Sequence, residues 1–326
     1  MAAVETSIFR SQLLERRGRL ESALAEHPSA EQLARLLDEV DAALAQMDDG
    51  TYGLCEACHD PVEPERLMAD PLMRFCLAHL TARQQEALEQ DIEMAMRIQA
   101  SLLPNRMLEA GAWHACYHYQ PLGPVSGDYC DWMAAPDGGL LFITGDVSGK
   151  GVASSLLMSH LHAIFRSLLS VGMPMSALLD QANRVFCEST LPSFYATLVC
   201  GHAHPDGSVE ICNAGHCPPV LVGRDSICTI TADALPLGLF STTRYAASRV
   251  VLAPGDSLVL YTDGITEAAG GSGEEYSPER LAGVLRRSYG LAPRHMTAAC
   301  LADLEAFLAG AAHSDDVTLM AIQRAA

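Results

Sequence analysis

The sequence contains no long hydrophobic run, and no stretch approaches the roughly 18 uninterrupted apolar residues of a transmembrane helix. Its first ten residues also lack a basic segment followed by an apolar one, which is the pattern of a secretory signal peptide. We therefore expect a cytoplasmic protein that does not bind a membrane and keeps its eleven cysteines as reduced thiols.

Positive charge is scarce in this chain. The 21 lysines and arginines are outnumbered by 40 aspartates and glutamates, which gives a formal net charge of -19. A charge of this sign repels nucleic acid and anionic lipid, so nucleic-acid binding by the whole chain is not expected. The length of 326 residues and the hydrophobic content of 49% predict a globular protein of two or more parts with a large core.

The N-terminal region, residues 1–48, has the periodicity of helices. Proline disfavours helix in the residue before it, so His27-Pro28-Ser29 predicts a break between two helices. A packed helical hairpin and a coiled coil explain the apolar stripe equally well. The stripe recurs at alternating intervals of four and three residues at Leu33, Leu37, Val40, Leu44 and Met47.

Four potential soft or borderline metal ligands follow this region. Cys55 and Cys58 form a C-x2-C pair, and Cys76 and His79 form a C-x2-H pair, a spacing that a tetrahedral Zn²⁺ ion selects. Cys55 to His59 also matches the haem attachment pattern, but that chemistry requires export. A redox dithiol would need a βαβ setting and would leave the second pair unexplained. We therefore predict a structural zinc site.

The same segment resembles the zinc finger of the DksA/TraR family. The resemblance rests on the Gly-Thr-Tyr-Gly sequence before Cys55 and on Pro61 to Leu67 after Cys58, and it predicts a finger at residues 49–80. The chain departs from the usual four-cysteine pattern at His79. That family contacts RNA polymerase through the tip of a long coiled coil, for which this chain has no matching acidic tip. We expect instead a scaffold that carries sensory or dimer contacts.

A third helix is predicted from Leu80 to about Leu103, where Pro104 ends it, and residues 81–104 are interpreted as a linker helix. From Met107 onward short apolar runs alternate with turns, which favours antiparallel hairpins. Helices are expected at about 151–170, 174–190, 277–289 and 293–309, so residues 105–326 are predicted to form an α+β layered domain. The expected strands are 113–119, 140–144, 196–202, 209–213, 220–222, 249–252, 257–261 and 317–322.

Aspartates stand where several of these strands end. Asp146 lies in a glycine-rich turn between a strand and a helix, and Asp128, Asp263 and Asp315 have similar settings. Mg²⁺ and Mn²⁺ prefer carboxylate, carbonyl and water oxygens, so four such side chains could hold two ions of a hydrolase. Each aspartate taken alone is more typical of a turn or a helix cap than of a metal ligand.

Five motifs follow one another along the chain. They are Gly127 to Asp131, Gly145 to Gly151, Asn213 to Pro219, Tyr261 to Ala268 and Asp315 to Leu319. The order resembles that of SpoIIE/RsbU-type serine phosphatases of the metal-dependent protein phosphatase (PPM) superfamily over roughly residues 105–324, and residues 95–104 resemble the segment that precedes such domains. The resemblance implies a β-sandwich of two antiparallel sheets flanked by helix pairs.

The resemblance also implies the roles of individual residues. Asp146 would bridge two metal ions, and the carbonyl of Val147 would bind one of them. Asp263 and Asp315 would bind the second ion, and Asp128 would support the first. The catalytic set is thus Asp146, Asp263 and Asp128, whereas the neighbours of these ligands, Asp131 and Asp316, are left out.

Two catalytic helpers known from the eukaryotic branch of the superfamily have no match here. Ser148 stands where that branch has a histidine suited to protonating the leaving group, and the phosphate-gripping arginine is missing. Lys150 either approaches phosphate or lies in solvent at the start of a helix. His216 is either catalytic or, as is more usual for a histidine beside two prolines, part of a turn.

The function implied is hydrolysis of phosphoserine or phosphothreonine by a water that two Mn²⁺ or Mg²⁺ ions activate. The substrate would be a regulatory protein such as an anti-sigma-factor antagonist of the STAS type. The N-terminal and linker helices would control the activity and form a homodimer. The alternative is a catalytically inert module that acts on the transcription machinery through its DksA/TraR-like part.

Overall fold

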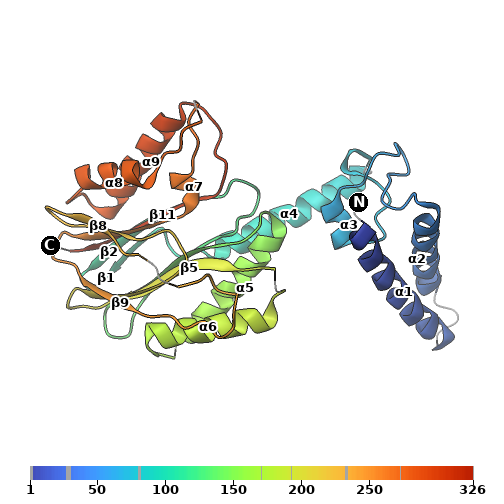
Figure 1. The fold of residues 1–326 in the computed structure, drawn as a ribbon, viewed down its shortest axis with the longest axis horizontal. Helices are drawn as coiled ribbons and strands as arrows, with labels where there is room; N and C mark the ends of the chain where they lie inside the picture. The colour runs from blue at the N-terminus through green and yellow to red at the C-terminus, as the bar shows by residue number, and fades with distance from the viewer. Residues whose placement is uncertain are drawn as a thin grey trace. The chain divides into compact units, whose positions relative to one another are not determined.

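The computed structural model describes residues 3–26, 31–79, 82–169, 171–191, 193–231, 234–271 and 273–325. The chain divides into two compact units, Met1–Asp91 and Ile92–Ala326 (Figure 1). Helix α4 (Ala82–Leu102) runs through the division, as the predicted linker helix does. The domain boundaries expected at residues 48, 80 and 104 stay predictions.

The first unit contains the two predicted N-terminal helices, α1 (Ala3–Glu26) and α2 (Glu31–Asp49). Residues 27–29, where the break was predicted, lie outside the described residues. Leu13 of α1 and Val40 of α2 belong to one buried cluster, which is the packing of a helical hairpin. The short helices α3 (Pro64–Ala69) and η1 (Leu77–His79) follow. A coiled coil between copies of the chain stays a prediction.

The second unit is built on two sheets in which every strand pair is antiparallel. The first sheet has the order β1-β2-β11-β10-β7-β8 and the second β3-β4-β5-β6-β9, so the predicted sandwich of antiparallel sheets is confirmed. The strands are β1 (Met107–Ala110), β2 (Trp113–Gln120), β3 (Asp128–Ala134), β4 (Leu140–Val147), β5 (Ala196–Ala203), β6 (Ser208–Ala214), β7 (Val220–Val222), β8 (Ile227–Thr229), β9 (Ser248–Val251), β10 (Ser257–Tyr261) and β11 (Val317–Arg324).

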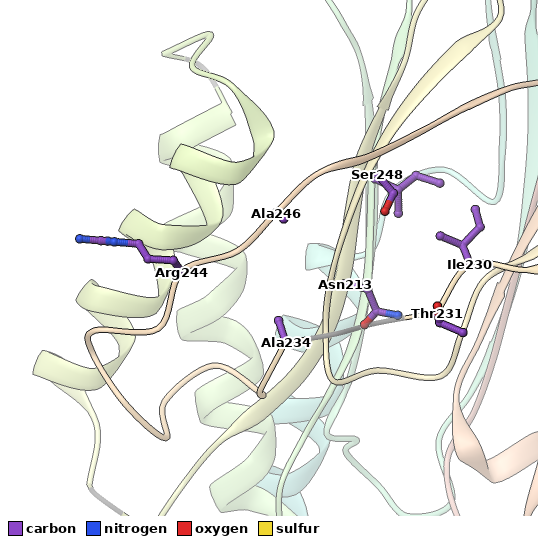
Figure 2. Close-up of a pocket in the computed structure, with 8 residues that line it drawn as sticks. Asn213, Ile230, Thr231, Ala234, Arg244, Ala246 and Ser248 are labelled. Carbon is purple, nitrogen blue, oxygen red and sulfur yellow. The ribbon is translucent and has the colours of Figure 1, made fainter.

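A small cavity of about 120 Å³ lies beside the β6–β9 edge of the second sheet (Figure 2). Asn213 of β6 and Ser248 of β9 line it together with Ile230 and Thr231. Arg244, which also lines it, pairs with Asp180 at 3.3 Å. None of the predicted metal ligands lines this cavity.

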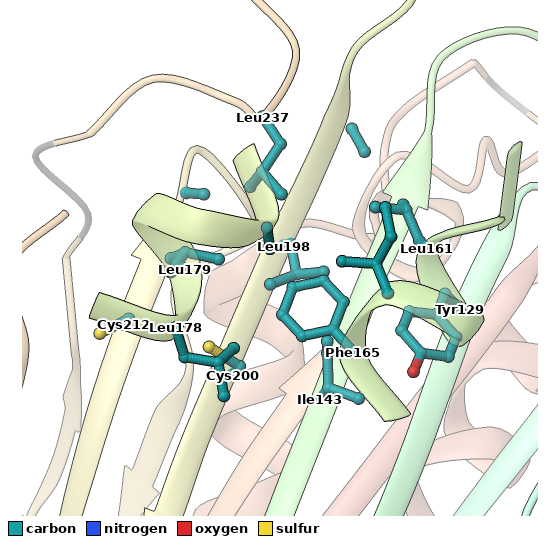
Figure 3. Packing of buried hydrophobic residues seen from close by; sticks show 14 of the residues in the cluster. Tyr129, Ile143, Leu161, Phe165, Leu178, Leu179, Leu198, Cys200, Cys212 and Leu237 are labelled. Atoms are coloured by element: carbon teal, nitrogen blue, oxygen red, sulfur yellow. The ribbon is translucent and has the colours of Figure 1, made fainter. Parts of the chain in front are cut away.

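A pair of helices covers the outer face of each sheet (Figure 1). Helices α5 (Val152–Leu169) and α6 (Met175–Ser189) pack on the second sheet, and α8 (Pro278–Arg287) and α9 (Pro293–Leu308) pack on the first. In the α5–α6 layer, Phe165 lies among Leu178, Leu179 and Leu198 (Figure 3). The four predicted helices are thereby confirmed, with ends that differ by no more than two residues.

A third cluster fills the space between the sheets, where Phe142 and Leu260 meet Met320. Because side chains alternate along a strand, Val259 and Tyr261 point the other way, toward α8 and α9. Strands covered on both faces need apolar residues at every position. This explains why β10 and β11 were visible in the sequence as continuous apolar runs.

Within the described residues, three strands and three short helices, α3 and η1 among them, were not predicted from the sequence. Strands β1 and β8 are short, and α7 (Asp263–Thr266) is a single turn. Strand β3 carries two buried aspartates, so it shows no apolar run. The β5–β6 register places Cys200 opposite Cys212, and both are buried free thiols.

Helix α5 is long and apolar enough to cross a membrane by length and composition alone, although the sequence analysis expected no such helix. Its buried residues Met158, Leu161 and Phe165 pack in the core of the second unit. This is the pattern of the core helix of a globular domain.

Asp131, the second aspartate of β3, is buried and forms a bidentate ion pair with Arg166 of α5, with both N–O distances at 2.6 Å. The backbone N–H of Trp132 also donates to it. A buried carboxylate that loses its cation keeps the desolvation cost without the compensating attraction. Strand β3 and helix α5 are therefore joined by a charge pair as well as by apolar contacts.

We predict that Arg166→Met lowers the free energy of unfolding of the second unit by about 3 kcal/mol. Both tryptophans, Trp113 and Trp132, lie in this unit, so their fluorescence in a denaturant titration reports it selectively. Arg184→Met on the surface of α6 is the control and should change the stability by less than about 0.5 kcal/mol. Equal stabilities of the two variants would contradict the prediction.

Candidate functional site

Two of the predicted ligands face each other across one strand pair. In the β3–β4 ladder Asp128 is the direct partner of Asp146. Directly opposed residues of antiparallel strands project from the same face of the sheet, with Cα atoms roughly 4.5 to 5.5 Å apart. Two carboxylates therefore lie side by side at this end of the second sheet.

Two threonines at the corresponding end of the first sheet contact the carboxylate of Asp128. Thr262 follows β10 and Thr318 lies in β11, and the hydroxyl of each donates a hydrogen bond to Oδ2 of Asp128, at 3.0 Å from Thr262. All three side chains are buried. Asp263 begins α7 directly after Thr262, so these contacts bring a third predicted ligand to the same end of the sandwich.

Asp315 and Asp316 precede β11 and have different surroundings. The carboxylate of Asp316 accepts hydrogen bonds from the N–H of Leu122 at 2.7 Å, the hydroxyl of Ser126 at 2.7 Å and the N–H of Gly127 at 3.1 Å. These donors occupy both of its oxygens and fasten the loop before β3. This supports the choice of Asp315 over Asp316 as the ligand.

The carboxylate of Asp315 has fewer hydrogen-bond donors around it than the carboxylate of Asp316. Oδ1 of Asp315 accepts from the backbone N–H of Asp316, and its Oδ2 lies 2.9 Å from Nζ of Lys150. Lys150 also donates to the carbonyl of Ser314 at 3.1 Å. Lys150 therefore lies just before the start of α5 and is exposed to solvent, with 65% of its side chain accessible, while its ammonium group pairs with a predicted metal ligand.

The charges of the aspartates act on one another. Burial raises the pKa of Asp146 to about 7, and the negative charges of Asp263, Asp315 and Asp316 contribute to the shift. Burial and Asp315 likewise raise the pKa of Asp263, and burial and Asp146 raise that of Asp128. Strongly raised carboxylate pKa values at one spot are typical of functional sites, where a cation compensates the charge.

The backbone leaves room for a cation beside these side chains. A Cβ atom on Gly127 would lie 3.0 Å from the carbonyl oxygen of Val147 and 3.1 Å from Oδ1 of Asp146, so only glycine keeps that space clear. The two oxygens are the predicted first-ion ligands, and carboxylate and carbonyl oxygens suit Mg²⁺ and Mn²⁺. The residues present thus fit the ions that the sequence predicts.

Among the described residues, the predicted ligand aspartates do not form one compact group of ligand atoms. In the described part of the chain, two groups of at least three side chains have their ligand atoms within 4.8 Å of one another, and neither includes the aspartates. Carboxylates that repel each other and surround two ions with bridging water are expected to stand farther apart. The α7 end is nonetheless tightly packed, since a Cβ on Gly264 would lie 1.9 Å from the carbonyl oxygen of Asp316.

Ser148 and His216 have structural contacts. The hydroxyl of Ser148 accepts from the N–H of Tyr195 at 3.0 Å, which holds the segment before β5. His216 is buried, its N–H donates to Oδ1 of Asn213, and its Nδ1 lies 2.8 Å from Oγ1 of Thr197. Burial lowers the pKa of His216 to about 4. It is therefore uncharged at neutral pH and closes the turn after β6.

Cys55, Cys58, Cys76 and His79 are brought together in the first unit, with their ligand atoms all within 4.8 Å of one another. Nδ1 of His79 lies 3.2 Å from Sγ of Cys76. Burial would raise the pKa of the Cys55 thiol, but the N–H groups of Cys76, Cys58 and Ala57 donate to it and lower its pKa to about 6. One stabilised thiolate, two further cysteine sulfurs and an imidazole are the donor set of a closed tetrahedral zinc site.

Sequence reasoning missed Thr262, Thr318 and Ser126. Hydroxyl residues beside an aspartate are common, and their function here depends on contacts between residues more than one hundred positions apart. Thr262 and Thr318 do stand within the motifs around Asp263 and Asp315. Their places within these motifs were the signal that the sequence offered.

Both units resemble known protein families. Residues 50–78 match the family described as prokaryotic dksA/traR C4-type zinc finger, which ends just before His79. Phosphoserine phosphatase RsbU of Bacillus subtilis (strain 168) is 28% identical over 186 residues, which cover 56% of this chain and 55% of that protein. Protein IcfG of Synechocystis sp. is 23% identical over 263 residues, covering 72% of this chain and 41% of that protein. The chain thus spans about half the length of the curated relatives it matches.

Solved structures share the fold of the second unit. The SiaA-PP2C domain of Pseudomonas aeruginosa superposes with a TM-score of 0.65 at 22% identity, covering 74% of this chain and 99% of that one. The PP2C phosphatase domain of SpoIIE from Bacillus subtilis superposes with a TM-score of 0.57 at 18% identity, covering 66% of this chain and 64% of that one. Residues 136–325, more than half of the chain, match the family described as Stage II sporulation protein E (SpoIIE), and the chain therefore belongs to the SpoIIE family.

Proposed function

We propose that this chain is a metal-dependent protein phosphatase that hydrolyses phosphoserine or phosphothreonine on a regulatory protein. The observation that carries the proposal is the meeting of Asp128 and Asp146 with Asp263 at one end of the sandwich, in a chain of the SpoIIE family. The name of the relative RsbU, a phosphoserine phosphatase, supports the same activity.

The ligand roles follow the sequence prediction. Asp146 would bridge two ions, the Val147 carbonyl and Asp128 would hold one, and Asp263 and Asp315 would hold the other. Mn²⁺ or Mg²⁺, when bound, would supply a nucleophilic water and neutralise the phosphoryl oxygens. The chain's own residues position these carboxylates, and the hydroxyls of the two threonines orient Asp128.

The proposed mechanism also involves one basic residue, Lys150, and one polar residue, Ser148. Lys150 lies beside Asp315, so a short movement of its exposed ammonium group would bring it to an incoming phosphate. Ser148 accepts a hydrogen bond from the N–H of Tyr195, and its hydroxyl is too weak an acid to replace a histidine, so the oxygen of the departing serine takes its proton from water. The phosphorus–oxygen bond to the serine breaks, and water supplies the oxygen of the released phosphate.

The proposed substrate is an anti-sigma-factor antagonist of the STAS type, on the strength of the family resemblance. The first unit and α4 would regulate the activity and form a homodimer. Apolar side chains exposed along α4, Leu88, Met94, Met96 and Ile98, support a helix contact between copies. A reducing, cytoplasmic location is proposed with it, since Cys55, Cys58 and Cys76 must remain thiolates to bind zinc.

We expect Asp146→Asn to lower phosphate release from a phosphoserine STAS-type protein by about 100-fold or more, because a bridging carboxylate stabilises charge at both ions. The assay follows phosphate release with Mn²⁺ present. Asp225→Asn, an exposed aspartate in the β7–β8 turn, is the matched control and should keep wild-type turnover.

A wild-type chain without turnover would argue against this function. It would favour the inert module that acts through the zinc finger, which should then bind RNA polymerase in a pull-down without requiring Mn²⁺. Undiminished turnover by Asp146→Asn would leave a phosphatase but place its metal site elsewhere.

Gly127→Ala should weaken Mn²⁺ binding by about 10-fold or more, because the added methyl group occupies the space between Val147 and Asp146. Isothermal titration of Mn²⁺ into each variant measures the effect. Gly123→Ala in the same loop is the control, since its Cβ would meet only the carbonyl oxygen of Val125 at 3.7 Å. Equal Mn²⁺ affinity of the two variants would count against this cation site.

His79→Ala should release zinc from the first unit at a lower chelator concentration than the wild type requires, while His79→Cys should retain it. Elemental analysis after dialysis against a series of chelator concentrations measures both. His59, which follows Cys58 in the sequence, is exposed and lies outside the ligand cluster. His59→Asn, which tolerates the positive φ of 60° at this position, should therefore keep its zinc. Zinc loss from His59→Asn equal to that from His79→Ala would refute the ligand assignment.

A further inference from the structure

A second group of metal-binding side chains lies in the Ile92–Ala326 unit, away from the aspartates. Asp137, His202 and His204 have their ligand atoms within 4.8 Å of one another. No motif of the sequence analysis includes these three residues. They are partly exposed, with side chains accessible at 42%, 19% and 30% respectively, so an ion from solvent can reach them.

The sandwich brings these side chains together through the register of its strands. His202 lies in β5 and His204 directly after it, so the two imidazoles project from the same face, with ring centroids 3.9 Å apart. Leu141 of β4 is the partner of His202. Asp137 lies in the turn that leads from β3 into β4, which places it beside both histidines.

The carboxylate of Asp137 is held between the two rings. Its Oδ1 lies 3.2 Å from Nε2 of His202, and its Oδ2 lies 3.3 Å from Nδ1 of His204. The N–H of Gly139 donates to Oδ1 at 2.9 Å and fixes the carboxylate in this position. Both imidazoles thus present a nitrogen to the same small space that both carboxylate oxygens face.

This donor set favours a borderline cation. Two imidazole nitrogens and one carboxylate are three of the ligands that Zn²⁺ takes, and they leave a tetrahedral position open. Mg²⁺ and Mn²⁺ prefer sites made of oxygen ligands, such as the one the aspartates offer. The two groups of side chains are therefore expected to select different ions.

The two sites lie at opposite ends of β4. Asp146 is near the C-terminal end of the strand, whereas Asp137 precedes its first residue, Leu140. At about 3.3 Å per residue, the strand separates the sites by roughly 20 Å. A cation bound by Asp137 would accordingly contact none of the proposed catalytic residues.

We propose that Asp137, His202 and His204 bind a Zn²⁺ ion that clamps the β3–β4 turn to the end of β5. The carbonyl of His204 accepts a hydrogen bond from Nε1 of Trp113 at 3.1 Å, so the clamp also reaches β2 of the other sheet. Water fills the open coordination position. The ion is structural and separate from the zinc of the first unit.

The test is zinc binding by the full chain. The finger of the first unit is first saturated with zinc, and excess Mg²⁺ is present to occupy the aspartates. Equilibrium dialysis against Zn²⁺ with elemental analysis should show one more zinc ion in the wild type than in His202→Ala/His204→Ala. His295→Ala, which removes an exposed histidine of α9 outside both ligand groups, should equal the wild type.

A second variant separates metal binding from folding. Asp137→Asn keeps the size of the side chain but removes its charge, and it should weaken zinc binding at this site by about 10-fold or more. Thermal unfolding followed by tryptophan fluorescence gives an independent readout of this unit. Added Zn²⁺ should raise the Tm of the wild type and of His295→Ala but not that of His202→Ala/His204→Ala. Equal zinc content of the wild type and both variants, with no Zn²⁺-dependent difference in Tm, would overturn the proposal.

Discussion

The arrangement of the second unit depends on two carboxylates side by side, of which Asp128 is buried and Asp146 is partly buried. Asp128 and Asp146 are direct partners in the β3–β4 ladder, a pairing that destabilises a sheet unless something compensates it. The hydroxyls of Thr262 and Thr318 provide part of that compensation and come from the other sheet. The two sheets must therefore meet at this end, and their meeting places α7 and the segment before β11 next to the pair.

Neighbouring aspartates in this protein differ in what their oxygens already contact. Asp131 is paired with Arg166, and the oxygens of Asp316 accept three hydrogen bonds from the loop before β3. Asp315 instead faces a lysine on the surface. A carboxylate whose two oxygens are both occupied by fixed donors has little left for a cation, so these contacts favour Asp315 over Asp131 and Asp316 as the proposed ligand, a choice that sequence position does not make.

The cysteines of the first unit contribute both to its hydrophobic core and to its candidate zinc site. Cys55 and Cys76 belong to the same buried cluster as Leu13, Val40 and Leu67, so the candidate ligands are also part of the core. Small units bury too little apolar surface to be very stable alone, and a metal that binds only the folded form adds directly to stability. The hairpin of α1 and α2 and the knuckles are thus expected to fold together.

Much of this protein could be predicted from the sequence, because local signals are strong where burial is complete. Continuous apolar runs revealed β10 and β11, and the spacing of Cys55 to His79 and the order of the five motifs indicated the two families. Strand β3 was missed, since its aspartates are buried only by virtue of partners far along the chain. The sequence by itself determined which residue types are available and which segments form helices and strands. Only the tertiary structure decided which side chains meet, namely Thr318 with Asp128, Lys150 with Asp315 and Asp137 with two histidines, because strand register and sheet closure bring distant residues together.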